Sequence, residues 1–197
     1  EKIYSNIKAA IDSKTILRIG LKIPILSSVF KGKLREAAGF KNLTFAISGA
    51  APINPDILSL FQELEIPLFE GYGMTEIAPI SVNTVKRGAK LGSAGKAVPD
   101  TVIEIVDIET GKRVLNSGES GEIRVKGPHM MLEYEGNAEE TKMTIRDGFI
   151  YTGDIGVLDS EGFLSITDRK KDVIFVKGFN VFPREIEEQL MTQENVS

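Results

Sequence analysis

The stretch LTFAISGAAPINPDILSLFQELEIPLFEGYG, residues 43–73, holds two apolar runs separated by a segment with helical spacing. The first run, residues 43–49, alternates and then becomes continuously apolar, as a buried strand does. Pro55 follows a potential N-cap at Asn54, and apolar residues then recur at helical intervals. The second run, residues 67–73, reads as the next strand. This order of strand, helix and strand predicts a crossover unit with parallel strands.

Each of these strands is followed by a loop rich in small residues, SGAAP (48–52) and GYGMTE (71–76). In parallel sheets, ligands bind at the carboxyl ends of the strands. In the second loop the Thr75 hydroxyl and the Glu76 carboxylate suit a phosphate and its divalent metal. The loops therefore predict a ligand site at one edge of the sheet. An ordinary strand-to-helix turn is the alternative for GYGMTE, because short motifs match by chance.

The pattern changes from about residue 91. Short alternating strands follow one another between Gly, Asp, Asn and Ser residues, which predicts an antiparallel sheet or a small barrel. A charged run, residues 168–172, comes next. Beyond it we expect two short strands around Gly178 and a helix from about Arg184, with Pro183 at its start.

Composition restricts the function classes. The chain is 42% hydrophobic and 26% charged, with a net charge of −4 that argues against a general nucleic-acid binder. The absence of cysteine excludes thiolate catalysis, and a single histidine argues against a multi-histidine metal cage. No apolar run approaches the length of a membrane span, and no secretory signal opens the chain. These features predict a cytoplasmic protein.

The first 35 residues are basic, with eight Lys or Arg residues against two acidic ones. Residues 2–13 and the segment up to Pro24 have helical spacing, and Pro24 should end or restart the helix. The cationic face could lie on an anionic membrane surface as a peripheral contact. The alternative is a solvated face in a helical linker.

Five stretches carry a resemblance when they are taken in order. They are SGAAP, GYGMTE, GEIRVKGPHMM, YTGDIG and DRKKDVIFVKGFNVFPREIE. Their order and spacing resemble the adenylate-forming acyl-CoA synthetases, and among these the bacterial and archaeal long-chain fatty-acid–CoA ligases. The resemblance covers about residues 40–191. It implies that a fatty acid and ATP with Mg²⁺ give an acyl-adenylate and pyrophosphate, after which CoA displaces AMP.

The resemblance also implies roles for single residues. The adenine would lie against Gly49, Ala50 and Ala51 and stack on Tyr72, which Gly71 and Gly73 flank. Thr75 would bond the α-phosphate and Glu76 would hold Mg²⁺. Asp154 would accept from both ribose hydroxyls, and Arg169 would donate to ribose or phosphate. From the residues alone, Asp154 could be a turn residue and Arg169 a surface ion-pair partner.

The catalytic set implied by the resemblance is Thr75, Glu76 and Lys171. Lys171 corresponds to the hinge about which a small C-terminal domain rotates between the two half-reactions. Lys177 and Gly178 would face the channel for the CoA arm, although a simple hairpin turn fits them nearly as well. The run IAPISV after GYGMTE would line part of an acyl pocket with Gly73, or simply be core.

The chain also departs from the family pattern. Glu133, Glu135 and Asn137 stand where the family usually shows Gly, an aromatic residue and Pro. A phosphate loop before residue 1 and a lysine beyond the end are missing, so we expect an internal fragment that is inactive alone.

The fold class expected is α/β plus β. Residues 1–85 would end an α/β subdomain, 86–168 would form a β-barrel subdomain, and 169–197 would hold the hinge and a truncated C-terminal domain. Alternative functions are another adenylating ligase, for an aryl acid or a carrier-protein substrate, and a non-catalytic nucleotide-binding relative.

Overall fold

The computed structural model describes residues 5–6, 9, 24–49, 53, 55–84, 88–176 and 179–190. The chain divides into two compact units, Glu1–Glu70 and Gly71–Ser197. The division falls inside one strand, at a different place from the three predicted domains, which stay a prediction. The helix expected over residues 2–13 falls almost wholly outside the described residues, as does the N-cap expected at Asn54.

The first unit contains the predicted crossover. Helix α3 (Pro24–Ala37) begins at Pro24, strand β1 (Ala46–Ser48) follows, and helix α4 (Pro55–Glu63) begins at Pro55. β1 pairs in parallel with the first residues of β2 (Leu68–Met74), from Ala46 opposite Leu68 to Ser48 opposite Glu70. The parallel strand pair is therefore confirmed.

The core of this first unit lies between the two helices and the strand pair. Its buried members are Leu34, Ile57, Phe61, Leu64 and Ile66. Apolar residues at helical spacing put one face of α4 into this core, as the sequence predicts.

The second unit is built from strands. It begins with the end of β2, which pairs antiparallel with β3 (Ile77–Val82), and β3 pairs with β4 (Lys96–Ala97). The strands that follow are β5 (Val102–Val106), β6 (Gly121–Lys126), β7 (Ile145–Arg146), β8 (Phe149–Leu158) and β9 (Leu164–Arg169). A short helix, α5 (Ala138–Thr144), precedes β7.

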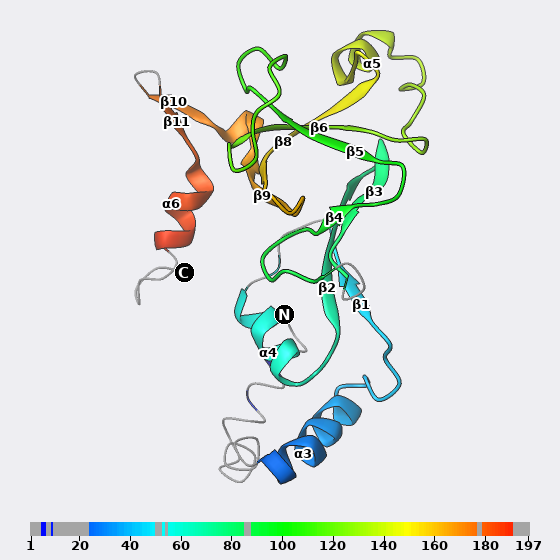
Figure 1. Ribbon diagram of the computed structural model, residues 1–197, viewed down its shortest axis with the longest axis vertical. Helices are drawn as coiled ribbons and strands as arrows, with labels where there is room; N and C mark the ends of the chain where they lie inside the picture. Colours follow the sequence, from blue (N-terminus) through cyan, green and yellow to red (C-terminus); the bar gives the residue numbers. More distant parts are fainter. Residues whose placement is uncertain are drawn as a thin grey trace. The chain divides into compact units, whose positions relative to one another are not determined.

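β8 is the central strand of a five-stranded antiparallel sheet. The order is β5-β6-β8-β7, and β9 pairs with β8 as well; Figure 1 shows β5, β6 and β8 side by side. The core on one face of this sheet contains Ile80, Ile105, Ile123, Ile150 and Leu164. The predicted antiparallel sheet is confirmed, and its closure into a barrel stays a prediction.

After β9 the chain forms a 3₁₀ turn, η2 (Lys170–Asp172), and then the strand pair β10 (Ile174–Val176) and β11 (Phe179–Val181). These two strands are antiparallel, and helix α6 (Pro183–Leu190) follows them. Val173 packs with Ile108 and Ile155 in a small core that Phe182 joins. Both predicted strands and the predicted helix with Pro183 at its start are confirmed.

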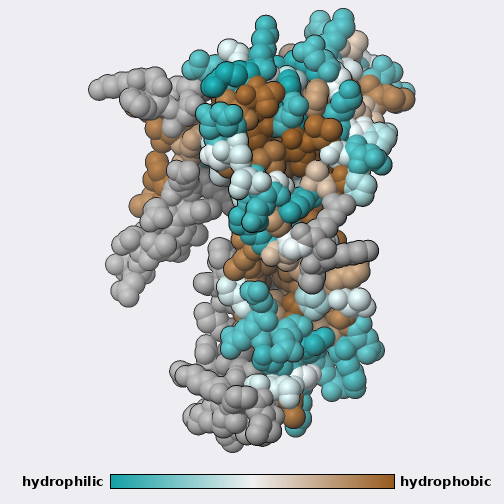
Figure 2. All heavy atoms as spheres, in the orientation of Figure 1, coloured by the Kyte–Doolittle hydropathy of each residue, from teal (hydrophilic) through white to brown (hydrophobic). Residues whose placement is uncertain are grey.

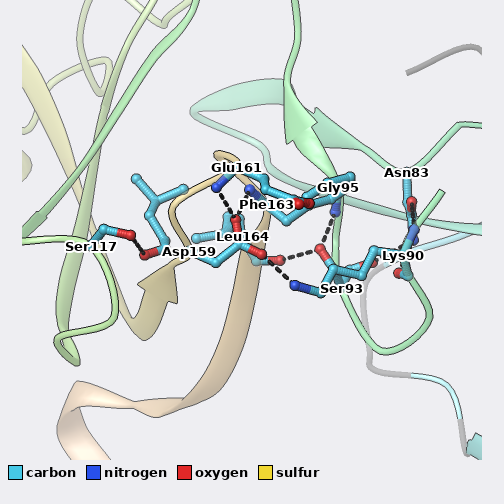
Figure 3. Close-up of polar contacts among 10 residues, drawn as sticks. Asn83, Lys90, Ser93, Gly95, Ser117, Asp159, Glu161, Phe163 and Leu164 are labelled. Atoms are coloured by element: carbon cyan, nitrogen blue, oxygen red, sulfur yellow. Dashed lines mark hydrogen bonds and ion pairs between the residues drawn. The ribbon is translucent and has the colours of Figure 1, made fainter. Parts of the chain in front are cut away.

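A network that we call the polar junction (Asn83, Lys90, Ser93, Gly95, Asp159 and Leu164) ties the β3–β4 connection to the β8–β9 hairpin (Figure 3). The buried Asn83 amide donates to the carbonyls of Lys90, at 2.6 Å, and Ser93, at 2.9 Å. The Ser93 hydroxyl donates to the Leu164 carbonyl at 2.8 Å and accepts from Gly95 N at 2.9 Å. Most of these bonds end on backbone groups, so the junction fixes the path of the chain.

Large hydrophobic side chains also lie on the surface of the second unit. Figure 2 shows hydrophobic residues on its visible face between hydrophilic ones, and Val102, Leu132 and Met143 are among those exposed. Within the described residues, no helix has both the length and the apolar character needed to cross a bilayer.

Candidate functional site

Three side chains from separate strands meet in the second unit. The Tyr72 hydroxyl, on β2, donates to Oδ2 of Asp154, on β8, at 2.6 Å. Arg169, on β9, places Nε 2.9 Å from the other carboxylate oxygen, Oδ1. Asp154 and Arg169 are partners in the β8–β9 register. Strand pairing brings Asp154 and Arg169 together, and Tyr72 reaches Asp154 from a different sheet through its side chain. We call these three residues the aspartate triad.

The aspartate triad is buried at its centre and open at one side. Asp154 is 6% exposed, whereas the Arg169 side chain is 61% exposed. Thr152 supports the backbone here, because its hydroxyl accepts from Asp154 N at 3.1 Å and donates to the Ile123 carbonyl at 2.9 Å. An exposed guanidinium beside a fixed carboxylate leaves donors free to meet an incoming ligand.

Burial dominates the ionisation of the triad. It raises the pKa of the Asp154 carboxyl, while the hydrogen bond from Tyr72 and the charge of Arg169 act to lower that pKa. Burial also raises the pKa of the Tyr72 hydroxyl, and the Asp154 charge raises it further. Tyr72 is therefore a protonated donor at neutral pH, and Asp154 is its acceptor.

The segment GYGMTE, predicted as a loop after the strand over residues 67–73, is mostly strand. β2 runs through both glycines to Met74, and Thr75 and Glu76 alone make the turn to β3. The partner strand β3 explains the difference, because it pairs with Gly71, Tyr72 and Met74, with an irregularity between the last two. A Cβ at position 73 would lie 3.2 Å from Ala78 Cβ, so a residue without a side chain suits this close pairing.

The carboxylate of Glu76 has a partner that the sequence did not suggest. Tyr134 donates its hydroxyl to Glu76 Oε1 at 2.6 Å, across a sequence separation of 58 residues. Tyr134 lies between β6 and α5, in the loop whose departures from the family pattern were Glu133, Glu135 and Asn137. An aromatic hydroxyl between two acidic residues, shortly before a helix N-cap, was the available signal.

The three departures themselves are surface features. Glu133 and Glu135 are exposed, and Asn137 caps α5 by accepting from Glu140 N at 3.1 Å. Among the described residues, none of the three bonds to a member of the aspartate triad.

For the other predicted site residues, the structure shows no bond to the aspartate triad within the described part of the chain. Thr75 is exposed on the turn beside Glu76, and Gly49 belongs to the first unit, at the end of β1. Ala50, Ala51, Lys177 and Gly178 lie outside the described residues. Of the residues expected to line an acyl pocket, Ile77 and Ile80 are 1% and 0% exposed and pack in the core.

Lys171 lies where the hinge was expected, between β9 and β10, and its side chain is exposed in η2. The preceding residue, Lys170, donates to Oε2 of the buried Glu122 at 2.7 Å, and Val173 is buried on the other side. The segment around Lys171 is therefore anchored immediately before and after it.

A divalent cation at this site would depend on a ligand for most of its coordination. The described residues contain no group of three or more His, Cys, Asp or Glu side chains that could hold a metal. Glu76 offers a single carboxylate, with Oε2 free of hydrogen bonds among the described residues. Mg²⁺ fits such a donor set, since it usually binds one or two carboxylates together with waters and substrate phosphates.

Comparisons with known proteins show which family the chain resembles. A family model described as AMP-binding enzyme matches residues 19–135. A long-chain-fatty-acid–CoA ligase of Salmonella typhimurium is 39% identical over 174 residues, covering 87% of this chain and 31% of the relative. A probable 4-coumarate–CoA ligase 3 of Dictyostelium discoideum is 37% identical over 178 residues, covering 88% and 32%.

Two solved structures extend the comparison. ATP-bound MatB from Rhodopseudomonas palustris has a TM-score of 0.73 at 33% identity, covering 86% of this chain and 35% of that one. The O-succinylbenzoate coenzyme A synthetase MenE from Bacillus subtilis, in complex with ATP and magnesium ion, has a TM-score of 0.68 at 32% identity, covering 86% and 36%. The chain thus spans about a third of the length of the relatives it matches.

Proposed function

The chain belongs to the AMP-binding enzyme family, and from this premise we propose that it supplies much of the nucleotide site of an AMP-forming acid–CoA ligase. The substrates would be an acid, ATP with Mg²⁺, and CoA. The acid would be a long-chain fatty acid, and the support for this choice is the 39%-identical relative named for that activity. The whole enzyme would be longer than 197 residues, and this chain alone would be inactive.

The aspartate triad is the observation that carries this proposal. Each Asp154 oxygen already accepts one bond, from Tyr72 or Arg169, and each keeps a further lone pair. The two oxygens could therefore accept from the two vicinal hydroxyls of a ribose. The fixed position of the carboxylate lowers the ordering entropy lost on binding.

The remaining nucleotide contacts would come from the residues that the family resemblance assigns to them. The Tyr72 ring would lie against the adenine, with Gly49, Ala50 and Ala51 against its edge. The Thr75 hydroxyl would donate to the α-phosphate. Bound with the phosphates at Glu76, Mg²⁺ would stabilise the charge that develops at phosphorus.

The proposal is tested with the full-length protein that carries this chain. We expect pyrophosphate release and thioester formation with a panel of fatty acids, and higher kcat/KM for long chains than for short ones. ATP binding without pyrophosphate release in the presence of any acid would instead identify a non-catalytic nucleotide-binding relative.

An aryl acid is the second candidate substrate, because relatives that are 36–37% identical are named probable 4-coumarate–CoA ligases. Cinnamic-type acids belong in the same panel. A kcat/KM for an aryl acid above that for every fatty acid would replace the fatty-acid proposal and leave the ligase chemistry intact. An amino-acid substrate is disfavoured, since IAPISV offers no acidic partner for an α-amine.

Lys171 is proposed as the hinge between the two half-reactions, with Lys177 and Gly178 facing the CoA arm in the second conformation. Proline at position 171 would lock φ and restrict the preceding residue. In the full-length protein, Lys171→Pro should keep acyl-adenylate formation at a reduced rate and lose transfer to CoA by orders of magnitude. Equal loss of both steps in a folded variant would remove the hinge assignment.

For localisation we propose a cytoplasmic protein that touches membranes peripherally through its basic residues 1–35. Such contact would be electrostatic, so the protein should co-sediment with acidic vesicles at low salt and be released as salt is added. Absence of binding at low ionic strength would assign this segment to an ordinary solvated face.

A further inference from the structure

The Glu76 carboxylate is held from outside its own hairpin. The Tyr134 hydroxyl bonds Oε1 at 2.6 Å, and Met131 N donates to the Glu76 carbonyl at 2.7 Å. Both contacts come from the connection between β6 and α5. Glu76 is therefore fixed through its backbone and through its side chain.

Tyr134 is itself anchored. Its backbone N–H donates to the Thr141 hydroxyl oxygen at 2.9 Å, and the Thr141 hydroxyl donates to the Asn137 carbonyl at 2.9 Å. Asn137 N donates back to the Tyr134 carbonyl at 3.1 Å. This closed set of bonds links Tyr134 to the start of α5, so the phenol is held in place before any ligand binds.

The contact leaves the two oxygens of the carboxylate unequal. A hydroxyl at 2.6 Å from an ionised carboxylate is a charge-assisted hydrogen bond. It occupies Oε1, whereas Oε2 has no hydrogen-bond partner among the described residues. Hydrogen bonds to a ligating carboxylate orient it, and their loss lowers metal affinity about 10–100-fold in known metal sites.

We infer that Tyr134 is a positioning residue that presents Oε2 of Glu76 as a one-oxygen ligand to the divalent cation bound with the nucleotide. This inference rests on the proposed function. Mg²⁺ demands nearly ideal octahedral geometry, so a carboxylate restricted to one oxygen and one orientation suits it better than a freely rotating one. Without the hydroxyl, the carboxylate must be ordered by the cation itself.

The test measures binding of Mn²⁺, as a paramagnetic substitute for Mg²⁺, by the full-length protein saturated with a non-hydrolysable ATP analogue. Tyr134→Phe should weaken Mn²⁺ binding about tenfold. A double-mutant cycle with Glu76→Gln tests whether the effect passes through Glu76. In the Glu76→Gln background, Tyr134→Phe should have no further effect.

Tyr151→Phe is the matched control. It removes a hydroxyl that donates to the Gly111 carbonyl at 2.8 Å in the same unit, without touching Glu76. It should leave Mn²⁺ affinity unchanged, and thermal melting of every variant checks that the fold is kept.

Each remaining result overturns the inference in a distinct way. If Glu76→Gln weakens Mn²⁺ binding and Tyr134→Phe does not, the inference fails and the proposed function stands. If Tyr134→Phe weakens binding equally in both backgrounds, its effect does not pass through Glu76. If Glu76→Gln itself changes nothing, the proposed metal role of Glu76 fails together with the inference.

Discussion

The polar junction and the aspartate triad lie in the same unit but use their polar side chains differently. In the junction, Asn83 and Ser93 bond chiefly to backbone groups, which holds a connection in place. In the triad, the side chains of Tyr72 and Arg169 both bond the Asp154 carboxylate, and Arg169 remains largely exposed. Side chains that bond backbone support the fold, whereas side chains that bond each other beside solvent can be recruited by a ligand.

The largest expected effect is on folding, at the junction. Gly95 has φ +89°, and a Cβ there would lie 2.2 Å from the backbone of Val82. We expect Gly95→Ala to lower the free energy of unfolding by ~3 kcal/mol or more, through left-handed strain and the backbone clash together. Chemical denaturation of the full-length protein measures this change.

Gly92→Ala is the matched control for that substitution. Gly92 also has positive φ, +74°, but a Cβ there would meet nothing within 4 Å. Gly92→Ala should lower the free energy of unfolding by about 1 kcal/mol, because only backbone strain acts there. Equal losses at positions 92 and 95 would show that close packing at the junction does not matter.

The next effect separates function from folding by comparing two aspartates of the β8–β9 hairpin. Asp154→Ala should slow ATP–pyrophosphate exchange about thirtyfold, since a lost hydrogen bond to a charged group is worth ~2 kcal/mol. Asp159 accepts from Glu161 N and Phe163 N in the hairpin turn. Asp159→Ala should lower the melting temperature while exchange per folded molecule stays near normal.

The opposite result would break the comparison. If Asp159→Ala abolished exchange in a folded protein, or Asp154→Ala left kcat/KM for ATP unchanged, the division between a supporting cluster and a binding cluster would be wrong.

The smallest effect is on the pH dependence of stability, and its sign should differ between the two aspartates. Burial is the main cause of the raised pKa of the Asp154 carboxyl. The stabilisation that Asp154 contributes is therefore fully present below its pKa in the unfolded chain, and it is lost as pH rises through its pKa in the folded protein. The Asp159 pKa is lowered, chiefly by Lys90, so its contribution is present above the unfolded pKa and is lost as pH falls through the folded pKa.

Melting curves from acid to neutral pH check these signs. Relative to the unmodified protein, Asp154→Asn should gain melting temperature as pH rises, whereas Asp159→Asn should lose it. Salt should shrink the Asp159 effect, because its pair with Lys90 is on the surface. If the melting temperatures of both variants changed with pH in the same direction relative to the unmodified protein, the assigned directions of the two pKa shifts would be wrong.

Local patterns in the sequence predicted much of the fold. The parallel pair of β1 and β2, the start of α4 at Pro55 and the β10–β11 pair follow from periodicity and proline placement. The reduction of the predicted GYGMTE loop to a turn at Thr75 and Glu76 was not predictable in this way. Its cause is pairing with β3, which overrides the low strand propensity of glycine.

The sequence predicted the residues of the candidate site better than the contacts between them, for a similar reason. The resemblance named Tyr72, Asp154 and Arg169, but neither the bond from the Tyr72 hydroxyl to Asp154 nor the Tyr134–Glu76 contact could be inferred, because both join distant residues. The predicted stacking of Tyr72 on adenine stays a prediction. The Ser93–Leu164 bond of the junction spans 71 residues and has no local signal at all.

The 82-residue separation of Tyr72 and Asp154 also bears on the order of folding. The β8–β9 hairpin closes through a short turn, whereas the Tyr72 contact requires closure of a long loop, with a larger loss of chain entropy. Contacts distant in sequence form more slowly than local ones. On refolding, nucleotide affinity should therefore return after the hairpin has formed, so recovery of binding would report a later step of folding than hairpin formation.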